Sequence, residues 1–263
     1  MKGALHAHTT FSDGEFSLEE LRHAYVRRGY QFVCLADHAE YFDERRIALY
    51  RAETRRLSDA SFCFVAGLEY ECPERMHILG LGTTELFRTR DPQEVIRSIE
   101  SDGGISIIAH PRAQDFSRIE AFELPPAGIE VWNSKYDGRY APRIQCFELL
   151  QRIRERDPRV RAYYGQDLHF RHQYTGLHVD LDAAVLDPAS IVAALRAGRF
   201  VATSGEVNLT SDGSLDRSLA SRFGQLNARS RRMSTLARKS KSVLDSVGIR
   251  IPARLKGQLR RLF

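Results

Sequence analysis

The stretch KGALHAHTTFSDG, residues 2–14, joins a short apolar run to a group of polar side chains. Successive side chains of a strand point to opposite faces, so His6 and His8 are expected to point the same way. Two imidazoles on one face can bind one metal ion, and Asp13 follows a few residues later. The stretch therefore predicts a strand over residues 2–7 that ends in a metal site.

The same pattern recurs along the chain. Apolar runs lead into His38, into Glu69, into His110, and into Asp167 and His169, while His77 lies inside another apolar run. We expect strands at 2–7, 32–36, 62–68, 76–81, 105–109, 128–132 and 161–165. Metal-ligand residue types at so many strand ends are difficult to explain by core packing alone.

Helix signals lie between these runs. Ser17-Leu18-Glu19-Glu20 is a capping box that predicts a helix ending at Gly29, and Asp91-Pro92 opens another. Asp187-Pro188 predicts a helix that stops at Gly198, and helices are also expected over 43–58 and 141–155. Strands that alternate with helices predict an α/β fold with a parallel sheet, open or closed into a barrel. A barrel gathers its strand ends in a ring, so ligands from many segments favour the barrel.

Composition limits the class of protein. The 263 residues carry a net charge of +5, but thirteen Lys and Arg against three Asp give residues 211–263 a balance of +10, which leaves −5 for residues 1–210. The four cysteines form no CxxC pair, which argues against a thiolate zinc site and against a disulfide scaffold. No apolar stretch reaches the roughly 20 residues of a membrane span, and we expect a cytoplasmic protein.

The order of these residues resembles that of the PHP family, which is named for its polymerase and histidinol-phosphatase members. The resemblance covers roughly residues 1–205. The blocks that carry it, besides the histidine pair and Asp167-Leu168-His169, are Gly67-Leu68-Glu69, Ile78-Leu79-Gly80, Ala109-His110-Pro111, Glu130-Val131-Trp132-Asn133 and Gly198-Arg199-Phe200. The resemblance implies a distorted (β/α)7 barrel, two or three divalent metal ions, and phosphoester hydrolysis.

The resemblance also implies how the ligands are shared. The first ion would be held by His6, His8, Glu69 and Asp167; the second by Glu69, His77 and His110; the third by Asp13, His38 and His169. Imidazole and carboxylate ligands without thiolate suit Zn²⁺, Mn²⁺ or Fe²⁺. Closely spaced ions can generate a bridging hydroxide, so no catalytic nucleophile from the protein is expected.

Residues that contact the substrate are harder to identify. Arg112, Lys135 and Arg171 each follow a candidate ligand or Asn133 closely, and arginine and lysine bind phosphate. Asn133 could donate a hydrogen bond near the metals. The alternative for each basic residue is a solvated loop charge, because the chain contains 39 Lys and Arg.

The C-terminal segment, 211–263, is expected to be a basic helical extension of the 1–210 domain. Leu215, Leu219, Phe223 and Leu226 are spaced three or four residues apart, a helical period that Met233 and Leu236 continue. The apolar stripe of such helices could pack on the acidic domain. Alternatively, the segment could bind an anionic membrane surface, a nucleic acid or a protein partner.

Two classes of function follow. The first is a metal-dependent phosphoesterase, with a phosphorylated small molecule or nucleotide as substrate, or alternatively a nuclease that acts on oligonucleotide ends. The second is a binding module that metal stabilises and that acts through its basic tail. The complete set of ligand-type residues favours the enzyme.

Overall fold

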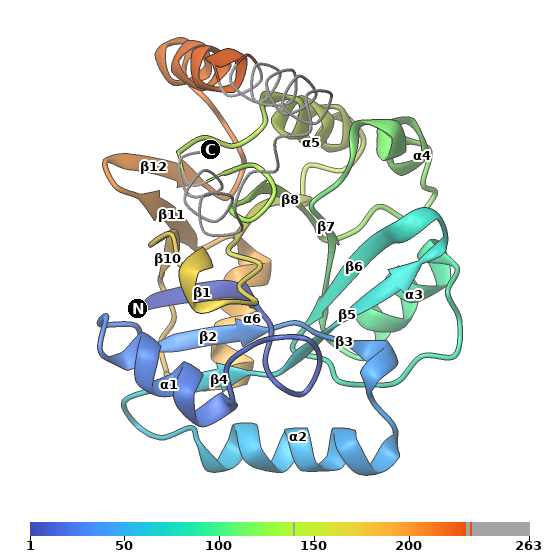
Figure 1. Cartoon of the computed structure of the whole chain (residues 1–263). Coiled ribbons are helices and arrows are strands. Elements are labelled where there is room, and N and C mark those ends of the chain that lie inside the picture. The colour runs from blue at the N-terminus through green and yellow to red at the C-terminus, as the bar shows by residue number, and fades with distance from the viewer. Residues whose placement is uncertain (139, 230–231, 233–263) are drawn as a thin grey trace, which may run out of the picture.

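The computed structural model describes residues 1–138, 140–229 and 232, and its strands form two six-stranded sheets. Helices lie around the outside of these sheets (Figure 1). The two sheets meet near the middle of the molecule (Figure 1). Among the described residues, no helix has the length and apolar character needed to cross a membrane.

The first sheet has the order β12-β11-β10-β1-β2-β4. Its strands are β1 (Lys2–Ala7), β2 (Phe32–Leu35), β4 (Cys63–Val65), β10 (His178–Leu181), β11 (Phe200–Ser204) and β12 (Val207–Thr210). β1, β2 and β4 are parallel, whereas β10, β11 and β12 pair in antiparallel fashion. The predicted strand at residues 2–7 is confirmed, and five of its six residues are buried, with Lys2 as the exception.

The second sheet has the order β3-β5-β6-β7-β8-β9. Its strands are β3 (Asp37–His38), β5 (Gly67–Cys72), β6 (Met76–Leu81), β7 (Ile105–Ala109), β8 (Gly128–Asn133) and β9 (Arg161–Gly165). Every residue of β7 and of β8 is buried, as is typical of strands covered on both faces.

The helices include three that begin where the sequence places a cap. The helices are α1 (Leu18–Val26), α2 (Glu44–Arg56), α3 (Pro92–Ser101), α4 (Phe116–Glu120), α5 (Ile144–Arg156) and α6 (Pro188–Ala197), with short 3-10 turns at Ala39–Tyr41, Pro73–Arg75, Ala113–Asp115 and Arg171–Gln173. Ser17 and Glu20 form the predicted capping box, and Asp91 and Asp187 cap the helices that follow them. Gly198 ends α6 in the left-handed conformation, with φ of 74°.

The prediction of a parallel sheet is correct for some strand pairs and wrong for others. β5 and β6 are antiparallel because only residues 73–75 separate them, and a parallel crossover needs about a dozen residues or more. β6 and β7 are also antiparallel, and β11 and β12 form a hairpin across residues 205–206. β5 and β6 thereby bring Glu69 and His77, eight positions apart in the sequence, into one corner of the sheet.

The closed (β/α)7 barrel is not confirmed, although the α/β class is. The predicted strand 62–68 is two strands, since Ala66 separates β4 in the first sheet from β5 in the second. Gly67 stands at this change of sheet, where a Cβ atom would lie 2.6 Å from the Leu35 carbonyl oxygen. Between the end of β1 and the residues that follow β9, the contact is a single isolated bridge, from Ala7 to Leu168. This bridge does not extend into a ladder of strand hydrogen bonds.

Part of the C-terminal segment packs on the domain. Residues 217–229 are helical, and Phe223 is fully buried with its ring 6.2 Å from that of Trp132. Leu215, Leu219 and Leu226 are partly buried against the same core, as expected if the apolar stripe covers the domain. The pattern at Met233 and Leu236 lies outside the described residues, and the boundary at residue 210 stays a prediction.

Candidate metal centre

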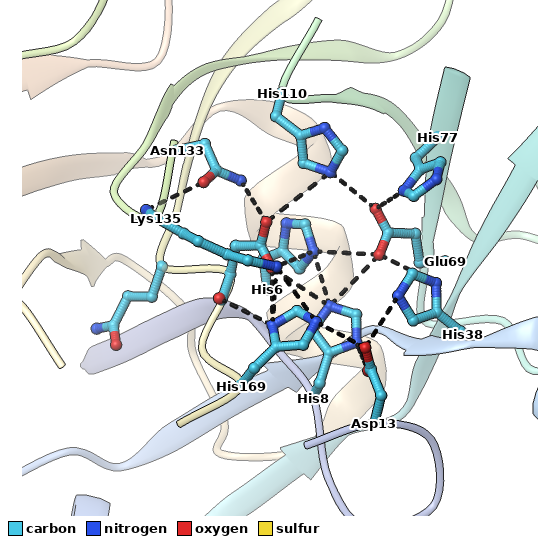
Figure 2. Close-up of polar contacts among 12 residues, drawn as sticks. His6, His8, Asp13, His38, Glu69, His77, His110, Asn133, Lys135 and His169 are labelled. Carbon is cyan, nitrogen blue, oxygen red and sulfur yellow. Dashed lines mark hydrogen bonds and ion pairs between the residues drawn. The ribbon is translucent and has the colours of Figure 1, made fainter. Parts of the chain in front are cut away.

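The nine candidate ligands lie in strands of both sheets or in the loops beside them, and they converge on one another. All of them except Asp167 are labelled in Figure 2. His6 lies near the end of β1 and His8 just beyond it, His38 ends β3, and His110 follows β7 directly. The remaining five are Asp13 in the loop before α1, Glu69 in β5, His77 in β6, and Asp167 and His169 after β9. Residues that are up to 163 positions apart in the chain therefore face one small volume.

Glu69 lies at the centre of this group. Its Oε1 is 2.9 Å from His77 Nδ1 and 3.1 Å from His110 Nε2. Its Oε2 is 3.4 Å from His8 Nε2 and 3.5 Å from His38 Nδ1. One carboxylate thus contacts histidines from several strands, an arrangement suited to a bridge between ions.

Asp167 occupies the other side of the two N-terminal histidines. Its Oδ1 is 3.0 Å from His169 Nδ1 and 3.6 Å from His8 Nε2, and its Oδ2 is 3.8 Å from His110 Nε2. The Nε2 atoms of His6 and His8 are 3.1 Å apart. The two rings therefore point into one volume, although His6, with φ of 63°, lacks the regular strand backbone on which the prediction rests.

The ligand atoms form four overlapping groups, in each of which all atoms lie within 4.8 Å of one another. The groups are His8, Asp13, His38 and His169; His6, His110 and Asp167; His6, His8 and Glu69; and His38, Glu69 and His77. All nine candidate residues belong to at least one group. The structure brings them together without defining how they divide among ions.

The donor atoms fit metal binding. The Nδ1 atoms of His8 and His38 are buried and lack a hydrogen-bond partner, although buried polar atoms in proteins are almost always paired. Imidazole nitrogens and carboxylate oxygens without a nearby thiolate suit Zn²⁺, Mn²⁺ or Fe²⁺. A bound cation would satisfy these unpaired nitrogen atoms and the converging carboxylates.

The charges of the buried residues also favour a cation. Burial opposes ionisation of Glu69 and Asp167, yet the surrounding imidazoles, His6 foremost, hold the pKa of both carboxyls well below the usual range. Burial likewise opposes the charged form of His6, but Glu130, Asp167 and Glu69 raise its pKa well above the ordinary value. For His8, burial dominates and lowers the pKa well below that of a free histidine.

The backbone at the site is strained. His6, His110 and Asp167 have φ values of 63°, 31° and 51°, in a region that residues other than glycine rarely adopt. Such a conformation costs about 1–3 kcal/mol per residue and is concentrated at functional sites. The strain turns these three side chains toward the centre instead of along a regular strand.

A second layer of residues, which sequence reasoning missed, orients the ligands. Glu130 is buried in β8, and its Oε1 lies 2.8 Å from His6 Nδ1. Its Oε2 accepts hydrogen bonds from the His110 backbone N–H and from Asn133 Nδ2, both at 2.8 Å. Because a carboxylate only accepts, a His6 ring that binds a metal ion would carry its proton on Nδ1 and offer the Nε2 lone pair to the ion.

Glycine is required next to this layer. A Cβ atom at Gly165 would lie 1.8 Å from Glu130 Oε1 and 2.9 Å from His6 Cβ.

The sequence does carry one signal for Glu130. It is a carboxylate between apolar residues of β8, and such a residue is rarely buried without a partner.

Asp37 holds the loop that carries Asp13. It is fully buried and accepts hydrogen bonds from the Thr9 backbone N–H at 2.8 Å and from Ser12 Oγ at 2.6 Å. It does not belong to any of the ligand groups. Its role is to position the loop at residues 9–13.

Of the four residues considered for substrate binding, Lys135 lies in the centre. Its Nζ is 3.1 Å from Asp167 Oδ1 and 3.2 Å from His169 Nδ1. Asn133 is buried, and its amide donates to Glu130 and to Asp167 while its carbonyl accepts from the backbone N–H groups of residues 135 and 136. Asn133 therefore orients the site through bonds that are already formed.

The two arginines point elsewhere. Arg112 pairs with Asp115 at 2.8 Å and donates to the Glu74 carbonyl oxygen. Arg171 pairs with Glu20 at 2.7 Å and lies over the Phe16 ring. Both are engaged by local acidic groups and neither is in the ligand cluster, as the alternative of ordinary loop charges predicts.

Comparison with known proteins agrees with this fold. No family model matches the sequence. A 41-residue segment is 46% identical to the DNA polymerase/3'-5' exonuclease PolX of Bacillus subtilis, which is 16% of this chain and 7% of that protein. The chain thus spans a small fraction of that relative.

Two solved structures are similar over most of the chain. One is a two-domain protein from Bacteroides vulgatus that contains a predicted PHP-like metal-dependent phosphoesterase, with TM-score 0.59, 18% identity and coverage of 86% of this chain and 69% of that one. The other is PsfC from Pseudomonas syringae, with TM-score 0.52, 12% identity and coverage of 88% and 98%. The chain therefore resembles the PHP-like metal-dependent phosphoesterases in its fold, as the order of its ligand-type residues predicts.

Proposed function

We propose that this protein is a metal-dependent hydrolase of phosphoesters, with a phosphorylated small molecule or nucleotide as substrate. The observation that carries the proposal is the convergence of nine imidazole and carboxylate residues, in four overlapping groups, on one partly open centre. The fold shared with a PHP-like phosphoesterase supports the same class of reaction.

The nine residues are proposed to hold two or three divalent ions, which when bound would supply an activated water and a positive charge for the phosphoryl oxygens. Glu69 contacts His77 through Oε1 and His8 through Oε2, and it is the candidate bridging ligand. Glu130 fixes the His6 ring, and Asn133 fixes Asp167. No serine, threonine or cysteine is needed as nucleophile.

Lys135 is proposed to position the phosphate. Its ammonium group is 3.1 Å from Asp167 Oδ1, and its side chain is 22% exposed, so an incoming anion can reach it. A lysine in this position offers a point charge that can follow the phosphoryl group during the reaction.

Hydrolysis of oligonucleotide ends is a second candidate. The observation that favours it is the 46% identity over 41 residues to a polymerase that is also a 3'-5' exonuclease. The candidate is tested with single-stranded oligonucleotides labelled at the 3' end, beside mononucleotides and sugar phosphates.

The proposal is tested by hydrolysis assays on the full chain loaded with Zn²⁺, Mn²⁺ or Fe²⁺. Release of phosphate or nucleotide that is lost in His8→Ala and retained in His23→Ala supports it, since His8 is buried in the centre and His23 is exposed on α1. Metal binding without hydrolysis of any phosphoester would overturn the proposal that the protein is an enzyme, and it would favour the metal-stabilised binding module.

A further inference from the structure

Exposed aromatic side chains gather around the candidate metal centre. In the described part of the chain, the exposed aromatic residues are Tyr41, Tyr136, Tyr140 and Phe170, with exposed fractions of 49%, 60%, 73% and 44%. Three of them lie beside a candidate ligand. The ring centroid of Tyr136 is 4.8 Å from that of His110, and those of Tyr41 and Phe170 are each 6.3 Å from His38 and His169, respectively.

This placement is not what packing of the core requires. Most of the ten tyrosines and fourteen phenylalanines lie in or against the core, where their apolar area stabilises the fold. Exposed apolar surface that is concentrated at one place marks an interaction site. We call Tyr41, Tyr136 and Phe170 the aromatic rim.

Tyr136 is the member that is most firmly tied to the centre. Its backbone N–H donates to Asn133 Oδ1 at 3.1 Å, and the Asn133 amide donates to Asp167 Oδ2 at 3.1 Å. The position of the Tyr136 backbone is therefore linked to a candidate ligand by two hydrogen bonds, while its ring stays open to solvent.

Lys135 and Tyr136 place a charge and a ring side by side. Lys135 Nζ is 5.1 Å from the Tyr136 ring centroid and 3.1 Å from Asp167 Oδ1. A ligand that engages both needs an anionic group at the metals and a flat apolar group a short distance away. Nucleotides have this combination, and a base can stack on an aromatic side chain.

Phe170 supplies a second flat surface at the centre. Its ring is stacked on His172, with centroids 5.8 Å apart and an interplanar angle of 13°. Its backbone N–H donates to Gln173 Oε1 at 2.9 Å, which fixes the turn that follows His169. The rim thus combines rings from chain segments near residues 41, 136 and 170.

We propose that the aromatic rim binds the base of a nucleotide substrate, with Tyr136 as the main stacking surface. This inference rests on the proposed function and narrows it from phosphoesters in general to those that carry a nucleobase. It assigns Tyr136 as a specificity-determining residue. The competing role is a shield that only protects the ligand histidines from solvent.

The test compares adenosine 5'-monophosphate with ribose 5-phosphate, which differ only by the base. Binding of each to the metal-loaded full chain is measured by calorimetry, and hydrolysis is measured in parallel, for wild type, Tyr136→Leu, Tyr136→Phe and Val185→Ala. Val185 is exposed and outside the rim, so its variant is the matched control.

We expect wild type to bind the nucleotide about 10-fold or more tightly than the sugar phosphate, as base stacking predicts. Tyr136→Leu should lose most of this preference with ribose 5-phosphate binding unchanged, whereas Tyr136→Phe and Val185→Ala should keep it. Equal binding of the two ligands by wild type, or a preference that Tyr136→Leu retains, would overturn the inference even if both are hydrolysed. Tighter binding of the nucleotide without hydrolysis of either ligand would instead support the role of the aromatic rim and contradict the proposed function.

Discussion

The two sides of the candidate metal centre differ in how their side chains are held. The inner group, His6, Glu130, Asn133 and Asp167, is buried and joined by hydrogen bonds of 2.8–3.1 Å. The outer group, Asp13, His38 and His77, has side chains that are 39%, 13% and 20% exposed, and the Nδ1 atom of His38 lacks a hydrogen-bond partner.

The difference indicates which ligands are preorganised. An ion bound to the inner group meets side chains whose orientation is already fixed, so little conformational entropy is lost. An ion bound to the outer group must order side chains that are partly exposed, Asp13 foremost. We therefore expect the inner part of the centre to bind metal more tightly than the outer part.

Removal of metal should have the largest effect. A chelator is expected to abolish hydrolysis and to remove the ions in two stages. The ions held by the outer group should leave before those held by the inner group. A ligand present at 100 times its dissociation constant stabilises the folded state by about 2.7 kcal/mol, so complete removal should lower the melting temperature by about 5–10 °C. Elemental analysis and calorimetry at increasing chelator concentration measure both effects. Release of all ions in a single stage would contradict the distinction between the two sides.

Asp167→Ala should be the most damaging single substitution. It removes an inner ligand and leaves His169 and Lys135 without their carboxylate partner. The loss of kcat/KM should exceed the roughly 100-fold upper range for residues that only orient a ligand. Asp182→Ala, at an exposed position, is the control and should match wild type. A similar loss in both variants would point to an effect on folding.

Glu130→Gln should weaken the inner group without removing a ligand. The amide keeps the size of the side chain but replaces one carboxylate oxygen with a donor, so one of its contacts to His6 and His110 is disturbed. Metal affinity is expected to fall about 10- to 100-fold, as for other residues behind a metal-binding histidine. Titration with Zn²⁺ measures the change, with exposed Glu123→Gln as control. Unchanged affinity would exclude Glu130 from the orienting role.

His38→Ala should have the smallest effect of the series. It removes an outer ligand whose Nδ1 atom has no hydrogen-bond partner, so the inner group is undisturbed. We expect a loss of activity of about 10-fold that added metal largely restores, because the remaining ligands still bind at higher concentration. Activity is measured across metal concentrations beside His23→Ala. A loss in His38→Ala as deep as in Asp167→Ala, and not restored by metal, would show that the two sides are equivalent.

Part of the ligand cluster was predictable because several of its members lie at the ends of strands or directly after them. Strand ends meet in α/β folds, so His38, His110 and Asp167 could be expected together from their places after apolar runs. The division of the strands between two sheets was not predictable in this way. The turn at residues 73–75 and the break at Ala66 change the strand directions and divide the strands between two sheets.

The residues around the ligands were harder to predict. Glu130 lies inside an apolar strand, and its partners His6 and His110 are 124 and 20 positions away, so only the folded chain reveals its contacts. Arg112 and Arg171 follow candidate ligands in the sequence, but nearby acidic side chains direct them away from the centre. A basic residue near a ligand in sequence is therefore weak evidence of phosphate binding.

The number of divalent ions bound per chain tests the central claim most directly. Elemental analysis of wild type equilibrated with Zn²⁺ or Mn²⁺ should give two or three ions per chain, with fewer in Asp167→Ala and an unchanged number in Asp182→Ala. Less than one ion per chain in wild type, or equal numbers in all three proteins, would contradict a metal centre built from these nine residues.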